Sequence, residues 1–374
     1  MDRLDRNGTL AIQRGGWLDL LRFAGACLIV AYHYQFSAPV PASAFPAVFQ
    51  RGYLVTDFFL IDSGYVLGRI YAARVASGRI GAGDFFRRRV LRVVPLHLMT
   101  LAALVGLVLA AGAAGVFPLH AAWFDWRELP GELFLVQAFG APGGHGWNTP
   151  TWSLSALVGC YLLFPLLARA VSRLSGRAAL AAAAAVFLAA DVATTRLLGH
   201  AVYALPLSWG FVRALPLFLA GLALARFSET VRIPERAAMA GGLAAAVALG
   251  ALQGFGEHGI ASLLLICVLI LAAAAIPVRR PSQLVAHAAL ATFSLYLSNE
   301  IVRIGWFGAA RIASDRLHLP LGAQWALWGG GMAAALVCGF ALYAWVDAPT
   351  QRWIAARAAR RRARPAALPR LRRP

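Results

Sequence analysis

Two ionisable side chains inside one apolar stretch are the first candidates for chemistry in this sequence. Residues 17–37 are apolar and long enough to form a helix that crosses a membrane, yet they include Arg22 and His33. Ionisable groups inside a bilayer cost free energy and therefore tend to mark a function. Eleven residues of helix bring the two side chains to within ~20° of one face and place them ~16 Å apart along the axis. We expect Arg22 near one membrane surface and His33 beyond the middle.

His33 has the side chain best suited to proton transfer, because an imidazole titrates near neutral pH. If the helix starts on the cytoplasmic side, His33 lies ~24 Å along a hydrocarbon core of ~30 Å, in its outer half. A lone histidine in a membrane helix can equally be a structural hydrogen-bonding group, so both interpretations stay open. The next apolar stretch adds two acids, Asp57 and Asp62, and either could pair with Arg22.

A cluster of arginines forms a second candidate site. Its members are Arg87, Arg88, Arg89 and Arg92. Arg89 and Arg92 are three residues apart, so they share one face of a helix. Guanidinium groups match the geometry of phosphate oxygens, which predicts a binding site for a phosphorylated donor. The same four arginines could instead serve only to anchor the topology of the membrane protein.

The composition excludes an ordinary soluble domain. The chain has 374 residues, of which 60% are hydrophobic, and a mean hydropathy of +0.66. The net charge is +19, and all 35 residues counted as Lys or Arg are arginine. Because these arginines lie between long apolar runs, they indicate the loops of a membrane protein, and no nucleic-acid partner is expected. The four cysteines lie in apolar runs without metal-ligand spacing, so we expect no metal and no bound cofactor.

Ten apolar stretches are long enough to span a membrane, which predicts an all-α bundle of about ten transmembrane helices. They cover residues 17–37, 53–73, 93–116, 152–171, 178–197, 205–225, 237–255, 260–278, 284–306 and 321–345. A shorter apolar piece at residues 133–139 is expected to be interfacial or re-entrant. We predict a single membrane domain over residues 1–350.

The distribution of arginine predicts the orientation of this bundle. With both termini in the cytoplasm, cytoplasmic segments hold 27 arginines and outer loops hold 5. This difference is a strong positive-inside signal. Residues 351–374 then form an Arg-rich cytoplasmic tail, which we expect to be disordered or to lie on anionic membrane lipid.

The longest outer loop covers residues 117–151 and is a candidate binding region. It contains three tryptophans, including Trp147, and a cluster rich in glycine and proline. Loops of this length are uncommon in compact domains unless they are functional or disordered. Tryptophan suits both a sugar-binding surface and a membrane interface, so the loop alone does not distinguish these roles.

Several motifs occur in the order and spacing of a known family. After Arg22 and His33 come TDFF at residues 56–59, SG at 63–64, RVLRVVPLH at 89–97, NTPTWSLS at 148–155 and YLLFP at 161–165. Weaker matches follow at residues 216–221 (PLFLAG), 294–297 (SLYL) and 347–349 (DAP). The chain resembles the membrane-bound acyltransferase-3 family, the O-acetyltransferases of bacterial surface polysaccharides.

The resemblance implies a ten-helix enzyme of the bacterial inner membrane. The donor would be a cytoplasmic acyl-CoA, most simply acetyl-CoA, which is a co-substrate and not a bound cofactor. The acceptor would be a hydroxyl of an envelope glycan or a lipid-linked glycan on the outer side.

The resemblance also assigns roles to residues. The family's arginine and histidine carry over to Arg22 and to His33 as the catalytic base, and its Arg-x-x-Arg pair carries over to Arg89 and Arg92 as the donor site. From residue type and position we add Asp57 to the catalytic residues and Arg88 to the donor site. The expected acceptor-binding residues are Trp147, Asn148, Trp152, Ser153 and Ser155.

The chain departs from the family pattern in several places. Leu157 stands where the family commonly has a glutamate after the Trp-Ser-Leu-Ser motif, and Asp62 stands where an apolar residue is usual. Glu300 and Asp191 are candidates to replace the missing acid, or they are structural partners of Arg303 and Arg213. The alternative to an enzyme is therefore a non-catalytic carrier, or a scaffold of a polysaccharide-export system.

Overall fold

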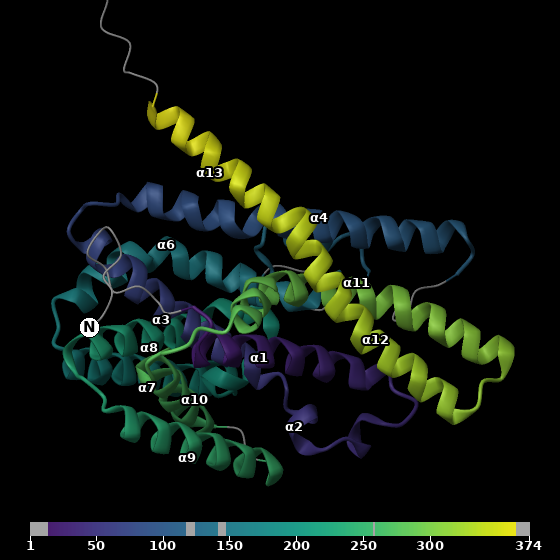
Figure 1. Ribbon diagram of the computed structural model, residues 1–374, viewed down its shortest axis with the longest axis horizontal. Helices are drawn as coiled ribbons and strands as arrows, with labels where there is room; N and C mark the ends of the chain where they lie inside the picture. Colours follow the sequence, from purple (N-terminus) through teal and green to yellow (C-terminus); the bar gives the residue numbers. More distant parts are fainter. Residues whose placement is uncertain (1–13, 117–123, 141–146, 257–258, 364–374) are drawn as a thin grey trace, which may run out of the picture.

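The computed structural model describes residues 14–116, 124–140, 147–256 and 259–363, and these residues form helices without a β-strand. Each expected apolar stretch coincides with one long helix. These helices are α1 (Trp17–Tyr34), α3 (Leu54–Ala76), α4 (Ala82–Ala113), α6 (Trp152–Ser172), α7 (Gly176–Leu198), α8 (Gly210–Thr230), α9 (Glu235–Gly254), α10 (Ile260–Ala275), α11 (Gln283–Leu317) and α12 (Leu321–Leu342). The all-α expectation is therefore confirmed (Figure 1).

Within the described ranges, six helical segments have the length and hydropathy to cross a membrane, which makes this a multi-pass membrane protein. They are Ala82–Ala113, Thr149–Ser172, Gly176–Leu198, Leu207–Thr230, Glu235–Gly254 and Leu321–Arg360. Helices α1, α3 and α11 are less apolar because they contain paired acids and arginines, and α10 has only 16 residues. The count of ten crossings and the cytoplasmic position of both ends stay predictions.

Short helical turns connect the long helices. They are η1 (Gln35–Ser37), η2 (Ala42–Ala44), α2 (Ala47–Gln50), α5 (Leu129–Leu133), η4 (Gln137–Phe139), η5 (Thr149–Thr151), η6 (Val202–Ala204) and η7 (Leu207–Trp209). The apolar piece at residues 133–139 falls on α5 and η4, which are too short to span a bilayer. It lies against α6, where Ser155 Oγ donates to the carbonyl of Leu135.

Helices α3 and α8 cross where a glycine of each helix lies against the backbone of the other. A Cβ atom added to Gly64 would lie 2.0 Å from the carbonyl oxygen of Phe218, and one added to Gly221 would lie 1.8 Å from that of Ile61. Glycine therefore occurs on both sides of the crossing because no other residue fits. Close backbone approach at small residues is the usual basis of helix packing in membranes.

Helix α1 lies inside the bundle and contacts α3, α10, α11 and α12. Its buried residues, such as Ala26 and Val30, face these neighbours. The two ionisable residues of α1 are therefore brought against several helices that carry polar groups of their own.

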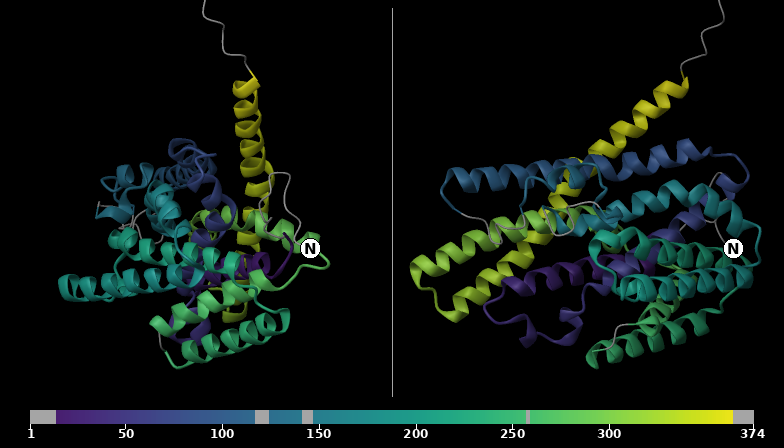
Figure 2. Two further views of the ribbon diagram at one scale, coloured as in Figure 1. Left: turned by 90° about the vertical axis from the view of Figure 1, so that its left-hand side faces the viewer. Right: turned by 180° about the vertical axis from the view of Figure 1, so that it is seen from behind.

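The C-terminal segment differs from the expected disordered tail. Helix α12 continues through a π-helical turn, η8 (Tyr343–Asp347), into α13 (Ala348–Ala363). Alanine and arginine have high helix propensity, which explains why the helix extends so far. Helix α13 projects from the bundle in all three views (Figures 1 and 2). Residues 364–374 lie outside the described part of the chain.

Candidate active site

Arg22 is held between two acids near the start of α1. Its Nε donates to Asp62 Oδ2 at 2.7 Å and its Nη2 to Asp62 Oδ1 at 3.0 Å, while its Nη1 lies 3.1 Å from Asp19 Oδ1. Of the two acids that could pair with Arg22, the structure selects Asp62 of α3. The two carboxylates offset the charge of the guanidinium, which allows it to lie within the bundle.

Asp57 has a different partner. Its side chain is fully buried and forms a bidentate ion pair with Arg213 of α8, with N–O distances of 2.8–2.9 Å. The guanidinium of Arg213 also lies over the ring of Trp152, 5.6 Å from its centroid. Asp57 therefore positions Arg213 and Trp152, while its expected part in catalysis stays a prediction. The expectation that Asp191 pairs with Arg213 is wrong, because Asp191 accepts from the backbone N–H of Val202.

His33 lies in the last turn of α1 and is partly exposed. Glu300 and Arg303 of α11 are near enough to interact electrostatically with its ring. These two residues form a buried ion pair with each other, and Arg303 Nε donates to Glu300 Oε2 at 2.9 Å. The expected pairing of Glu300 with Arg303 is thus confirmed. The contact between α1 and α11 is fixed beside His33, where Tyr34 Oη donates to the carbonyl of Asn299 at 2.9 Å.

The five expected acceptor-binding residues are buried, and four of them form a side-chain hydrogen bond within the protein. Asn148 Nδ2 donates to the carbonyl of Leu297 at 3.2 Å, and Ser153 Oγ lies 2.8 Å from Tyr296 Oη. Trp147 Nε1 donates to the carbonyl of Asp125. The other two are Trp152, under Arg213, and Ser155, bonded to Leu135. Asn148 and Ser153 thus join η5 and α6 to α11, and direct contact of the five residues with an acceptor stays a prediction.

The four arginines of α4 separate into two pairs. Arg92 binds Asp347 of the π-helical turn at 2.6 Å, and Arg89 donates to Tyr71 Oη at 2.6 Å and lies over the same ring. Arg87 and Arg88 line a groove of about 690 Å³ between α4 and α13. Arg88 Nε and Arg89 Nε are buried and have no hydrogen-bond partner among the described residues, and Arg87 pairs with Asp84 at 3.4 Å. The arginines that sequence spacing favoured, Arg89 and Arg92, are thus already engaged, and Arg87 and Arg88 face the groove.

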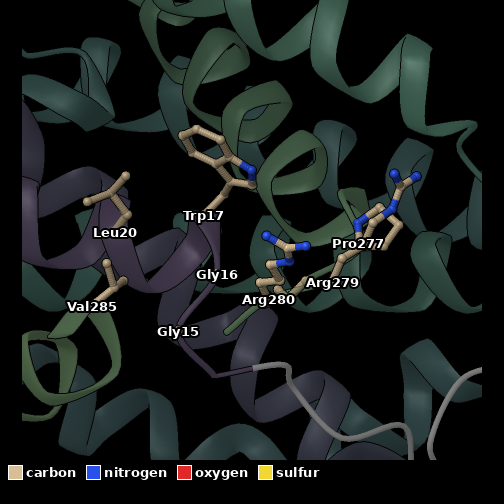
Figure 3. Close-up of a pocket in the computed structure, with 9 residues that line it drawn as sticks. Gly15, Gly16, Trp17, Leu20, Pro277, Arg279, Arg280 and Val285 are labelled. Carbon is tan, nitrogen blue, oxygen red and sulfur yellow. The ribbon is translucent and has the colours of Figure 1, made fainter. Parts of the chain in front are cut away.

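A second pocket lies at the start of α1. It has a volume of about 260 Å³ and is lined by Trp17 and Leu20 on one side and by Arg279 and Arg280 on the other (Figure 3). Arg279 is also paired with Glu235 at 2.6 Å. This pocket opens at the end of α1 that holds Arg22. The structure thus has two basic openings, one at the start of α1 and one between α4 and α13.

One functional candidate, Glu132 of α5, was missed by sequence reasoning. Its side chain is 1% exposed, and its Oε2 accepts from Thr151 Oγ1 at 2.7 Å and from Gln137 Nε2 at 3.1 Å. Its backbone carbonyl accepts from His97 Nε2 at 2.9 Å. The only signal in the sequence was an acid beside the short apolar piece at residues 133–139.

No three His, Cys, Asp or Glu side chains in the described ranges come together as a metal site would require. The four cysteines, all within these ranges, are free thiols. The chemistry available here is that of a histidine beside an ion pair, with arginines at two basic openings.

A bundle with an Arg and a His on one helix, and with arginines lining a groove at the start of another, fits the membrane acyltransferases as a class. The chain belongs to the acyltransferase-3 family, because the family model, described as an acyltransferase domain, matches residues 16–344. This match confirms the resemblance inferred from the motifs.

Two curated relatives support the assignment. The chain is 30% identical over 164 residues to acyltransferase MdmB of Streptomyces mycarofaciens, covering 42% of this chain and 40% of that protein. It is 32% identical over 152 residues to protein 2 in the picA locus of Rhizobium radiobacter, covering 37% of this chain and 73% of the relative. The matched region thus spans less than half the length of MdmB. No solved structure matches the chain.

Proposed function

We propose that the protein is an integral O-acyltransferase of a bacterial inner membrane. It transfers an acyl group, most simply acetyl, from cytoplasmic acyl-CoA to a hydroxyl of an envelope glycan or glycolipid on the outer side. The observation that carries this proposal is the placement of His33, partly exposed and beside the Glu300–Arg303 pair, on the same helix as Arg22. Membership of the acyltransferase-3 family supports it independently.

In this mechanism His33 is the general base. Its unprotonated ring nitrogen takes the proton of the acceptor hydroxyl as the oxygen attacks the thioester carbonyl. A new C–O bond forms, the C–S bond breaks, and the leaving thiolate takes the proton from the imidazolium. Because Glu300 and Arg303 compensate each other, they add little net charge near the ring.

The donor binds at the cytoplasmic ends of α4 and α1. The groove beside Arg87 and Arg88 supplies guanidinium groups for the phosphates of CoA. Arg89 and Arg92 hold the walls of this site through Tyr71 and Asp347. Arg22 lies deeper in the bundle, where it lines the path of the acyl group toward His33.

The acceptor binds at the outer end of α1. Trp147, Asn148, Trp152, Ser153 and Ser155 form the wall behind this site, in which Asn148 and Ser153 bond to α11. Asp57 supports the same wall through Arg213 and Trp152.

The test is transfer of a radiolabelled acetyl group from acetyl-CoA to envelope glycans by the purified protein in liposomes. His33→Ala should lower the transfer rate by about 10²–10⁴-fold, the usual contribution of a general base. His287→Ala is the matched control, since His287 is an exposed histidine of α11 and bonds only to its own helix. Equal rates for His33→Ala and wild type would contradict the assignment of His33.

The rival function is a carrier of acyl donor or glycan, or a scaffold of an export system. It is favoured by Leu157, which occupies the place of the family's usual glutamate and is buried among apolar residues. A carrier would move labelled glycan across the liposome membrane without acyl-CoA, whereas the proposed enzyme would not.

A further inference from the structure

Glu132 differs from every other buried acid in the described parts of the chain. There are six such acids, and five of them lie within 4 Å of an arginine nitrogen: Asp19, Asp57, Asp62, Glu300 and Asp347. Glu132 is 1% exposed and has no arginine, lysine or histidine within that distance of its carboxylate in the same ranges. An isolated carboxylate is costly to bury, so such a group tends to be neutral.

The hydrogen-bonding groups around Glu132 include more acceptors than donors. His97 Nε2 must carry the ring hydrogen, because it lies 2.9 Å from the carbonyl oxygen of Glu132. In the neutral ring His97 Nδ1 is therefore an acceptor, and it is buried without a partner in the described structure. Gln137 Oε1 and Asn148 Oδ1 are also buried acceptors that no described donor reaches. A proton on Glu132 would supply a donor, whereas a negative charge would add a further acceptor.

The Glu132 cluster is connected to the candidate active site. The backbone N–H of Asn148 donates to the Glu132 carboxyl group, and Asn148 Nδ2 donates to the carbonyl of Leu297. Leu297 lies in α11, three residues before Glu300, and Glu300 interacts electrostatically with both Glu132 and His33. A change at Glu132 is therefore transmitted through η5 to the part of α11 that faces His33.

We propose that Glu132 is a positioning residue of the acyl-transfer site that works as a neutral carboxylic acid. It donates to Thr151 Oγ1, which lies 2.7 Å away and donates its own hydrogen to the carbonyl of Asn148, and it accepts from Gln137. In this way it holds the 148–151 segment against α11. This inference rests on the proposed function. Ionisation of Glu132 would place an unpaired charge in the cluster and loosen the contact between Asn148 and Leu297.

The charged surroundings of Glu132 favour its neutral form. The pKa of this carboxyl group is raised to about 8, chiefly by burial and in part by the negative charges of Glu128 and Glu300, while hydrogen bonds from Thr151 and Asn148 oppose the rise. His97 of α4 is the other titratable group in contact with Glu132, because its Nε2 donates to the backbone carbonyl of Glu132. Because the pKa is higher in the folded state, the neutral form contributes stability that is present at acidic pH and is lost as the pH rises through about 8.

Glu132→Gln mimics the neutral acid, and Glu132→Leu removes the polar group. At pH 6.5 we expect Glu132→Gln to transfer acyl groups within about threefold of wild type and Glu132→Leu to lose about tenfold or more, because buried partners are left unsatisfied. From pH 6.5 to 9.5 the unfolding temperature and kcat of wild type should fall relative to those of Glu132→Gln. Glu128→Gln, at a partly exposed acid of the same loop, should keep this fall but shift it to lower pH, because the charge of Glu128 helps to raise the pKa of Glu132.

Two results would overturn the proposal. One is a Glu132→Gln variant with the same pH dependence as wild type, and the other is a Glu132→Gln variant as inactive at pH 6.5 as Glu132→Leu. If wild type itself transfers no acyl group, the proposed function fails and Glu132 has no transfer site to position. The pH dependence of unfolding would then show separately whether Glu132 is buried as the neutral acid.

Discussion

Charged side chains within this bundle are held in specific pairs that join different helices. Arg22 links α1 to α3, and Arg213 links α8 to α3. Breaking such a pair leaves one buried charge without compensation, which costs more than removing both partners. The pairs therefore fix the relative positions of the helices that carry the candidate site.

The substitution Asp57→Asn tests whether the buried pair of Asp57 with Arg213 stabilises the bundle. We expect a loss of about 3–5 kcal/mol in unfolding free energy, because the Arg213 guanidinium stays buried without its carboxylate. Thermal or denaturant unfolding in detergent measures the loss. The double variant Asp57→Asn, Arg213→Met should recover much of it, and a single variant as stable as wild type would refute the structural role of the pair.

The sequence could not predict which acid pairs with which arginine in the candidate site. The sequence offered Asp57 and Asp62 as alternatives for Arg22, and only the packing of α3 on α1 and α8 selects between them. The candidacy of His33 came from residue type and position alone. Glu132 was missed because its significance depends on burial and on having no cationic partner, and neither is visible in a loop sequence.

Helices pack in this protein where glycine removes the side chain at a crossing. Gly64 and Gly221 face each other's helices and leave no room for a methyl group. Apolar length predicted that α3 and α8 exist, because hydropathy is a local property. Their crossing was not predictable, since it depends on two glycines 157 residues apart.

Gly221→Ala should destabilise the fold. Its Cβ would lie 1.8 Å from the carbonyl oxygen of Ile61, so α3 and α8 must separate, at a cost of about 1–3 kcal/mol. Gly241→Ala in α9 is the control: its Cβ meets no atom within 4 Å, and alanine favours the helix by up to about 1 kcal/mol. Unfolding temperatures in detergent should move in opposite directions for the two variants. A Gly221→Ala protein as stable as wild type would contradict the tight crossing.

The sequence also did not predict how far the helices extend beyond the apolar stretches. Helix α4 begins at Ala82, eleven residues before the expected start, because its first three turns are charged. Helix α13 extends to Ala363 although it is rich in arginine. Both extensions matter, since together they form the groove that contains Arg87 and Arg88.

The whole molecule is arranged with a basic groove at one end and His33 in the last turn of α1. In the proposed function these are the donor and acceptor sides. Such a division predicts that substitutions at the groove change donor affinity and leave acceptor affinity unaltered.

The double variant Arg87→Ala, Arg88→Ala should raise KM for acetyl-CoA by about tenfold or more, because each guanidinium–phosphate contact adds a charge-assisted hydrogen bond. KM for the acceptor should stay at the wild-type value. Arg169→Ala, an exposed arginine in the last turn of α6, is the control. If KM for acetyl-CoA stays unchanged in the double variant, the donor does not bind in this groove.

The π-helical turn at residues 343–347 has a consequence for how the groove is built. A π-turn carries one residue more than an α-helical turn, and each residue rotates a helix by ~100°. This single extra residue therefore determines which face of α13 closes the groove, namely the face with Ile354 and Ala358. Asp347 joins the turn to Arg92 of α4. Removing one residue here would turn another side of α13 toward Arg88. Inserting or deleting one residue in this five-residue turn would therefore change which face of α13 lines the groove, without moving α1.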